Sequence, residues 1–357
     1  MTMLVPKVVV VVFAITSYVV GALSKNVCTK PSVRREWRAF SAQEKAAWIR
    51  AVDCLSHLPH DPALTATVDP SISQIPPINA SGSYYDDIVY THMDLNIRIH
   101  FTGLFLPWHR WYVYLFENAL KSKCGYTGVS PYWNWTIDAP DYFESSFWKD
   151  SDPQSGLGGW GNPKADYSVP DGGFRNLHLS YPSPHTVRRD FTLQPFGDLP
   201  LKEANSSFLA PEIEKLLETP AGDYKSFQAA FEAFGGAHSS VHLIVGGDLG
   251  GTCPNNAPSN CIPGPTWSPN DPLFWMHHAM VDKVWYDWQH RNPESAKSFF
   301  GGSVQALQNL DSHNQYPNGG PPFLNLSSTM PADGLSSEVT MGDVMNTTSG
   351  ILCYIYE

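Results

Sequence analysis

The pair of adjacent histidines in the segment DPLFWMHHAMVDKVWYDWQ, residues 271–289, limits the folds open to this chain more than any other feature. Apolar and aromatic residues recur around the pair at helical spacing, which predicts a helix packed in the protein interior. A buried imidazole needs partners for its ring nitrogens, either hydrogen-bonding groups or a metal ion. His277 and His278 therefore indicate a polar or metal-binding centre inside a helical core.

Six of the 13 histidines fall into two sets of three on predicted helices. In the first set, His92 and His100 lie two turns apart and so on one helix face, and His109 opens the next helix. In the second set, His238 and His242 lie one turn apart, and the third member comes from the adjacent pair. No cysteine or carboxylate holds an equivalent position, so a bound metal would have nitrogen ligands alone.

The spacing of these histidines leaves the metal open. An H-x-x-x-H helix also occurs in zinc metalloproteases, where a glutamate directly after the first histidine is the base. Ser239 stands at that position here. Imidazole binds zinc and copper alike, but two sets on packed antiparallel helices favour a paired metal site. A zinc hydrolase that uses only His238 and His242 is the alternative.

Helical segments separated by long loops predict a mainly α fold. Ser41 and Glu44 form a capping-box pattern at the start of a helix over residues 41–58. Aromatic residues make up 13% and charged residues 16% of the chain, against about 25% charged in a typical domain, which predicts a large aromatic interior. We expect a helical core that houses the metal site, wrapped by long loops with few short strands. Further helices are expected over residues 86–100, after Pro107, over about 223–245 and over 271–289, and surface loops over 151–200 and 248–269.

The amino terminus predicts secretion. Lys7 precedes an apolar run, residues 8–20, that is too short to span a bilayer, and small residues follow it. Residues 1–24 are therefore expected to be a secretory signal peptide and residues 25–357 the mature extracellular domain, with an N-terminal membrane anchor as the alternative. The formal net charge of −11 argues against nucleic acid or an anionic membrane surface as a partner.

Six cysteines in a secreted chain predict three disulfides, although the sequence allows fifteen pairings. One arrangement closes a local loop, joins the two ends of the chain and leaves the last two cysteines together: Cys253–Cys261, Cys28–Cys353 and Cys54–Cys124. Asn-x-Ser/Thr sequons also fit secretion, and Asn134, which lies between two tryptophans, is expected to be the least exposed of them. The sequons are at Asn79, Asn134, Asn205, Asn325 and Asn346.

Four segments, in the same order along the chain, resemble the signatures of the tyrosinase superfamily, which includes tyrosinases, catechol oxidases and molluscan haemocyanins. They are IHFTGLFLPWHRWYVYLFENAL, CGYTGVSPYWNW, HSSVHLIVGG and SPNDPLFWMHHAMVDKVW, and the likeness runs from the Cys28 region to the C-terminus. The resemblance implies a four-helix bundle core that houses a type-3 centre with two copper ions, in which the second histidine of the adjacent pair is a ligand. Copper A would be held by His92, His100 and His109, and copper B by His238, His242 and His278. His277 is then expected to have a structural or gating role, and Asp282 to orient His278 or a neighbouring ligand.

The resemblance also implies that the copper pair binds O2 and takes two electrons from an o-diphenol, which leaves as an o-quinone. In related tyrosinases, an asparagine after the first copper-B histidine and a nearby glutamate polarise a water that helps to deprotonate monophenols. Ser239 and Glu232 would stand at these places here, and serine orients the water less well. We therefore expect a catechol oxidase rather than a full tyrosinase. Leu243, Met280 and His277 are expected to shape substrate access.

The resemblance implies two further expectations for the C-terminal end of the chain. Many relatives have a C-terminal lid domain, which we expect to be missing here. Tyr354 and Tyr356 resemble the tyrosine motif that closes the catalytic domain of relatives, and Arg34 is expected to pack against it. An o-aminophenol oxidase and a haemocyanin-like oxygen carrier are the alternative functions within the family, and the oligomeric state stays open.

Overall fold

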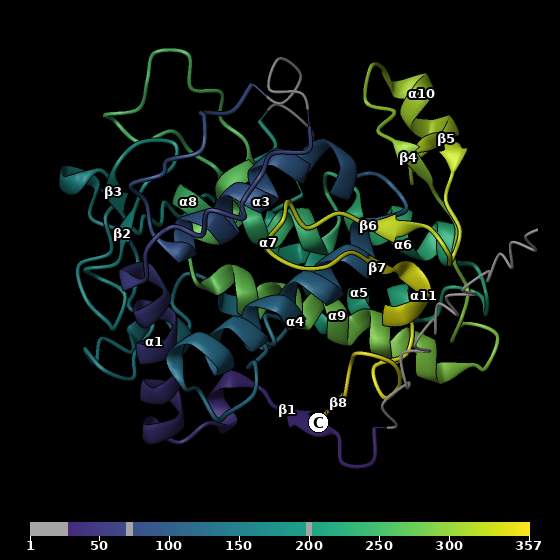
Figure 1. Ribbon diagram of the computed structural model, residues 1–357, viewed down its shortest axis with the longest axis horizontal. Coiled ribbons are helices and arrows are strands. Elements are labelled where there is room, and N and C mark those ends of the chain that lie inside the picture. The colour runs from purple at the N-terminus through teal and green to yellow at the C-terminus, as the bar shows by residue number, and fades with distance from the viewer. Residues whose placement is uncertain (1–27, 69–73, 198–201) are drawn as a thin grey trace, which may run out of the picture.

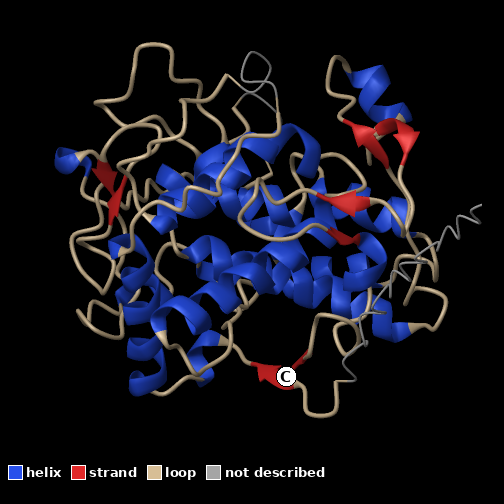
Figure 2. Ribbon diagram, viewed as in Figure 1, coloured by secondary structure: helices blue, strands red, loops and turns tan. Residues whose placement is uncertain are grey.

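The computed structural model describes residues 28–68, 74–197 and 202–357. The predicted signal peptide, residues 1–24, lies outside the described residues. Helices dominate the described part and long loops surround them, as Figure 2 shows. Its longest strand has 4 residues, and its strands pair only two at a time. The predicted mainly α fold with few short strands is therefore confirmed.

Four helices form the centre of the molecule: α3 (Tyr84–Ile99), α4 (Phe105–Cys124), α7 (Ala237–Val245) and α9 (Leu273–Arg291). Two of them, α4 and α9, run side by side through the middle of Figure 1. Their contact includes the stacked rings of Phe116 and Trp275, whose centroids lie 3.7 Å apart. Helix α1 (Ala42–His57) packs on α3 and α4, and the predicted capping box of Ser41 and Glu44 begins it.

Shorter elements surround this centre. A 3-10 helix, η6 (Pro265–Asn270), packs against α3 and precedes α9. In the described part, no helix is long and apolar enough to cross a membrane. The other α-helices of the described part are α5 (Ala210–Leu217), α6 (Tyr224–Glu232), α8 (Gly247–Gly250), α10 (Leu310–Gln315) and α11 (Met341–Val344). The strands are β1 (Ser32–Arg34), β2 (His178–Leu179), β3 (His185–Thr186), β4 (Gly302–Val304), β5 (Gly320–Phe323), β6 (Thr329–Met330), β7 (Val339–Thr340) and β8 (Tyr354–Tyr356).

The two ends of the described chain meet. Strand β1 pairs in parallel with β8, and both lie next to the C-terminus in Figure 1. A disulfide between Cys28 and Cys353 ties them together. The other two disulfides join Cys54 to Cys124 and Cys253 to Cys261, so the proposed pairing of all six cysteines is confirmed.

A buried polar cluster fixes this meeting point to the central helices. The Arg34 guanidinium lies 3.6 Å from the ring centroid of Tyr354, as the predicted packing on the tyrosine motif requires. The hydroxyls of Tyr354 and Tyr356 donate to Asp282 Oδ2 on α9 at 2.5 and 2.6 Å. Arg110 on α4 donates through Nε to Asp282 Oδ1. We call these five residues the C-terminal clasp.

The expected surface loops over residues 151–200 and 248–269 are only partly at the surface. They bury several polar and aromatic side chains, among them Arg189 and Trp267. The Arg189 guanidinium forms an ion pair with Asp271, just before α9, at 2.7 Å. Glycine and proline content predicted correctly that regular structure is sparse here, limited to short elements such as β2, β3 and η6, but this content does not indicate burial. These segments cover the central helices, and polar contacts such as the ion pair of Arg189 hold them in place.

Candidate metal centre

The histidines of the two predicted sets lie together inside the four central helices. They form one group of His92, His100 and His109, and a second group of His238, His242, His277 and His278. Within each group the ring nitrogens that could bind a metal all lie within 4.8 Å of one another. The relative exposure of these side chains is at most 9%. The structure therefore brings together all the residues that the sequence indicated as ligands.

The first group is built at the junction of α3 and α4. The ring centroids of His92, His100 and His109 lie 4.9–5.7 Å apart. His92 and His109 lie on the helices, but His100 is the residue after α3 and has extended backbone angles, φ −122° and ψ 143°. The expectation that His92 and His100 share one helix face is therefore only approximate, because the chain turns towards the site at His100.

Backbone carbonyls fix the tautomers of the first group. The Nδ1 atoms of His92, His109 and His100 lie 2.6, 2.8 and 3.2 Å from the carbonyl oxygens of Thr266, Phe105 and Asn96. A carbonyl oxygen accepts hydrogen bonds and donates none, so Nδ1 of His92 and of His109 carries the proton and their Nε2 atoms carry a lone pair. Among the described residues, the buried Nε2 atoms of His92 and His109 have no hydrogen-bond partner. Unpartnered lone pairs of this kind fit a metal ion.

The second group is built from α7 and α9. His242 donates from Nδ1 to the carbonyl oxygen of Leu249 at 2.9 Å, so its Nε2 also carries a lone pair. This Nε2 lies 3.3 Å from Nε2 of His278. Neither ring nitrogen of His238 or of His277 has a hydrogen-bond partner in the described part of the chain. The second group thus offers more free imidazole nitrogens than a single ion needs.

The two adjacent histidines of α9 occupy different places. The ring of His278 stacks on that of His109 at 4.3 Å and so lies between the two groups. The ring centroid of His277 lies 5.4 Å from that of His238, 4.7 Å from that of His242 and 6.4 Å from that of Trp135. Successive helical residues point about 100° apart, which separates the two rings. The position between the groups makes His278 the better placed of the two to face both metals.

Burial sets the charge of these imidazoles. It lowers the pKa of His100 to about 3 and that of His242 to about 4, and it also lowers the pKa of the other five histidines well below the usual value. The imidazoles are therefore neutral near pH 7, the state in which they bind metals. Among the described residues the groups contain no carboxylate or thiolate, so the donor set is nitrogen alone, which suits copper or zinc. The residues present fit a pair of such ions.

The remaining predicted site residues do not all lie where the sequence suggested. Glu232 is buried, which raises the pKa of its carboxyl well above the usual value. Its carboxylate accepts from the Phe101 N–H at 2.5 Å and from Gln228 Nε2 at 3.0 Å. Ser239 Oγ donates to the backbone carbonyl of Glu232 at 3.3 Å and not to its carboxylate. Leu243 is half-buried, next to His242.

Asp282 and Met280 lie on α9 beyond the two histidines. Met280 is buried, with 5% exposure. Asp282 hydrogen-bonds within the C-terminal clasp, and its hydrogen bonds in the described part include none to His278. Two arginines and two tyrosines contact its carboxylate, so these hydrogen bonds give no support to the expectation that Asp282 orients His278 or a neighbouring ligand.

Sequence reasoning missed the groups that orient the ligands. For His92 and His242 these are the backbone carbonyls of Thr266 and Leu249. Every residue has a carbonyl, so no residue type marks one that will face a histidine.

Comparisons with known proteins agree with this arrangement. A family model described as the common central domain of tyrosinase matches residues 82–291. The chain is 31% identical over 350 residues to the tyrosinase-like protein phomQ1 of Diaporthe leptostromiformis, covering 92% of this chain and 78% of that protein. It is 27% identical over 388 residues to tyrosinase P of Aspergillus terreus, covering 97% and 98%. A solved structure of polyphenol oxidase from Thermothelomyces thermophila superposes with a TM-score of 0.68 at 28% identity, covering 92% of this chain and 89% of that one.

Proposed function

Since the chain belongs to the tyrosinase family, we propose that it is a copper-dependent polyphenol oxidase that uses O2 to oxidise o-diphenols to o-quinones. One observation carries this proposal. Two groups of neutral, buried imidazoles lie against each other, and His109 of one stacks on His278 of the other at 4.3 Å. Two metal ions held in these groups would be close enough to act on one O2 molecule.

The proposed ligands are those that the resemblance to tyrosinases implies, and the buried ring nitrogens of each group support them. Copper A would be bound by His92, His100 and His109, and copper B by His238, His242 and His278. His277 would then pack beside the second group and, with Leu243 and Met280, shape access for the substrate.

The bound copper pair would supply the electron-accepting centre at which O2 is reduced. Each o-diphenol gives up two electrons and two protons as it becomes an o-quinone, so two diphenols reduce one O2 to two waters. The residues of the chain hold the ligands in fixed tautomers through backbone carbonyls and exclude water with aromatic rings. The ring centroid of Phe105 lies 4.7 Å from that of His238, and the ring centroid of Phe274 lies 4.2 Å from that of His278, so both rings border the imidazoles.

The surroundings of Glu232 support diphenol oxidation over monophenol hydroxylation. A monophenol has a pKa of about 10, so its binding as a phenolate needs a base. Both carboxylate oxygens of Glu232 already accept hydrogen bonds from Phe101 and Gln228. Ser239 does not reach this carboxylate. Ser239 and the Glu232 carboxylate are therefore not joined by a hydrogen bond that would hold the two side chains as a pair for polarising a water, and we propose catechol oxidase activity as the main function.

We also propose that the protein is extracellular. Three disulfides join its cysteines, and the described part has no free cysteine. Disulfides persist in oxidising compartments. The sequon residues Asn79, Asn325 and Asn346 are exposed, whereas Asn134 and Asn205 are half-buried. The exposed three are the proposed glycosylation sites.

Oxygen uptake by the copper-loaded protein tests the proposed activity. A monophenol and its matching o-diphenol are measured side by side, with zinc-loaded protein as the inactive control. Turnover of the diphenol alone supports a catechol oxidase, and turnover of both would make the chain a full tyrosinase. Preference for an o-aminophenol would change the substrate class. Reversible O2 binding without quinone formation would contradict an oxidase and indicate an oxygen carrier.

A further inference from the structure

A single closed loop supplies backbone acceptors to a histidine in each group. The Leu249 carbonyl, at the end of α8, accepts from Nδ1 of His242 at 2.9 Å. The Thr266 carbonyl, in η6, accepts from Nδ1 of His92 at 2.6 Å. His242 belongs to the second group and His92 to the first. We call the segment that joins the two carbonyls, residues 249–266, the neck loop.

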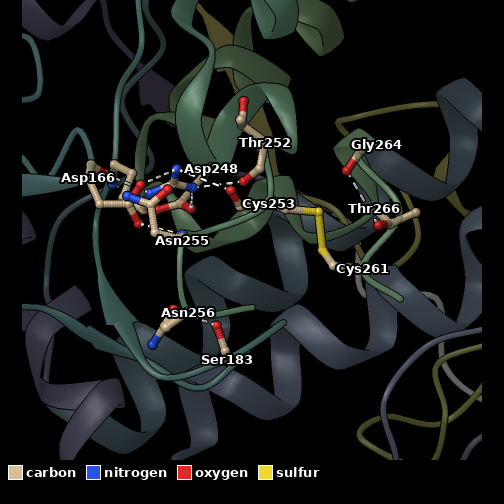
Figure 3. The surroundings of a disulfide bond; sticks show 11 residues. Asp166, Ser183, Asp248, Thr252, Cys253, Asn255, Asn256, Cys261, Gly264 and Thr266 are labelled. Atoms are coloured by element: carbon tan, nitrogen blue, oxygen red, sulfur yellow. Dashed lines mark hydrogen bonds and ion pairs between the residues drawn. A yellow bond between two sulfur atoms is a disulfide. The ribbon is translucent and has the colours of Figure 1, made fainter. Parts of the chain in front are cut away.

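The neck loop is closed just beyond these carbonyls. Gly264 donates from its N–H to the carbonyl oxygen of Gly251 at 2.9 Å, which joins the two arms two residues from each acceptor. The disulfide between Cys253 and Cys261 closes the loop a second time, as Figure 3 shows. The two arms cannot separate while both links hold, so the positions of the two acceptor carbonyls depend on each other.

Buried charges anchor one arm of the neck loop to the fold. Asp248, directly before Leu249, is fully buried and accepts from His185 Nε2 at 2.9 Å and from the Arg188 N–H at 2.8 Å. Arg188 also donates from its guanidinium to the carbonyl oxygen of Thr252 at 2.7 Å. Figure 3 shows Asp248 and Thr252 on the same side of the disulfide. The anchored arm carries the His242 acceptor, and the link between Gly251 and Gly264 extends this restraint to the other arm.

We propose that the neck loop is a positioning element that couples the two metal groups, so that closure of its neck sets metal affinity in both at once. The proposal rests on the proposed function in that it takes the two histidine groups to bind copper. Groups that orient a metal-bound histidine through its second nitrogen are worth about 10–100-fold in metal affinity when they are disturbed. Opening the neck disturbs one such acceptor in each group, so both ions should bind more weakly.

Two glycines of the neck provide a matched test. A Cβ on Gly251 would lie 1.7 Å from the carbonyl oxygen of Gly264, and φ at Gly251 is +75°, so Gly251→Ala must force the arms apart. A Cβ on Gly264 would meet nothing within 4 Å, and Gly264→Ala keeps the N–H that closes the neck. The two variants add the same methyl group to opposite arms, and only one of them opens the neck.

Copper affinity is measured by competition with a chelator, which needs no enzyme activity. We expect Gly251→Ala to weaken both copper sites about 10–100-fold and Gly264→Ala to leave both unchanged. Weakening of one site alone, or of neither, would overturn the coupling. Wild-type protein that binds no copper would instead refute the proposed function, which keeps the two failures distinct.

The disulfides provide a second comparison that does not depend on the fold of the Gly251 variant. Replacing both Cys253 and Cys261 by alanine removes the second closure of the neck loop. Replacing both Cys54 and Cys124 by alanine removes a disulfide between α1 and the end of α4. We expect both double variants to unfold at lower temperature, but only the first to lose copper affinity at both sites. Equal copper affinity in the two double variants would overturn the proposal.

Discussion

The Nε2 atoms of His242 and His278 lie 3.3 Å apart, and both side chains are buried. Because His242 already donates from Nδ1 to Leu249, its Nε2 carries a lone pair that faces the second ring. Two nitrogens bound to one ion with bonds of about 2.0 Å would have a similar separation. This separation supports the proposal that His278, from the adjacent pair of α9, and His242 bind the same metal ion.

This assignment predicts different metal contents for two neighbouring variants. We expect His278→Ala to bind about one copper ion fewer per chain than the wild type, because it removes a proposed ligand. His277→Ala should keep the full copper content, since His238, His242 and His278 remain. Elemental analysis after copper loading and dialysis distinguishes them. Loss of an ion from the His277 variant but not from the His278 variant would reverse the assignment.

Much of this arrangement could be predicted from the sequence, and the rest depends on contacts that sequence patterns do not encode. Helical spacing placed the histidines on the central helices, and the even cysteine set fitted three disulfides. The same spacing could not show that the chain leaves α3 at His100. It also placed Asp282 one turn from His278, although Asp282 lies in the C-terminal clasp. Helical periodicity predicts where a residue lies along a helix and on which face. It does not predict the partner of a buried carboxylate, because that partner comes from a segment distant in sequence.

The backbone at Phe101 and the neck loop are two further features that sequence patterns do not reveal. Phe101 has φ +51°, a left-handed conformation that non-glycine residues rarely adopt, and its N–H donates to the Glu232 carboxylate. Nothing in the sequence around residue 101 indicates this turn, because the acceptor lies 131 residues away. The neck loop was likewise expected at the surface, although it supplies the acceptors for His92 and His242.

The depressed pKa of His242 makes a prediction for the metal-free protein. Burial lowers this pKa to about 4, whereas an unfolded histidine has a pKa of about 6.5. Between these values the unfolded chain binds a proton that the folded chain does not. The stability that neutral His242 provides is therefore complete above pH 6.5 and is lost as the pH falls towards 4. Each pH unit in this window costs about 1.4 kcal/mol for this one group.

The difference between variants isolates that contribution, because burial raises the pKa of Asp333 to about 7 and gives it the opposite pH dependence. The free energy of unfolding is measured with denaturant at pH 6 and pH 5 on metal-free protein. His242→Gln should lose about 1.4 kcal/mol less than the wild type over this interval. The exposed His290, changed to Gln, is the control and should behave as the wild type does. Equal pH dependence in all three proteins would contradict a neutral buried His242.

The C-terminal clasp predicts a large stability effect at Arg34. This side chain is fully buried, and it donates to Glu117 at 3.0 Å and to Asp282 at 3.4 Å. Although burial alone would raise it, Arg34 and Lys121 hold the pKa of Glu117 at about 2. Arg34→Met would remove from each of the buried carboxylates of Glu117 and Asp282 one of its two cations, which we expect to cost about 3–5 kcal/mol.

Denaturant unfolding of the Arg34→Met variant measures this cost directly. Arg50 is exposed on α1, so Arg50→Met serves as the control and should stay within about 0.5 kcal/mol of the wild type. If the two variants unfolded at the same denaturant concentration, the clasp would contribute no stability beyond an ordinary surface arginine. Copper content of the folded Arg34→Met protein should be unchanged, because Arg34 contacts none of the histidines among its described hydrogen bonds.

The last prediction concerns the choice between diphenols and monophenols. Ser239 follows the first histidine of α7, and its hydroxyl is held by the backbone carbonyl of Glu232 at 3.3 Å. An asparagine at this position has a longer side chain with both donor and acceptor atoms, so it can hold a water together with the Glu232 carboxylate. A positioned base contributes about 10²–10⁴-fold to proton transfer. We therefore expect Ser239→Asn to raise the ratio of monophenol to diphenol turnover by at least about tenfold, which is less than the full rate gain from a positioned base.

Adding Glu232→Gln to the Ser239→Asn variant should remove the gain, while the Gln side chain still accepts from the Phe101 N–H. Rates with paired substrates measure both effects, and an unchanged ratio in Ser239→Asn would show that Ser239 does not limit monophenol hydroxylation.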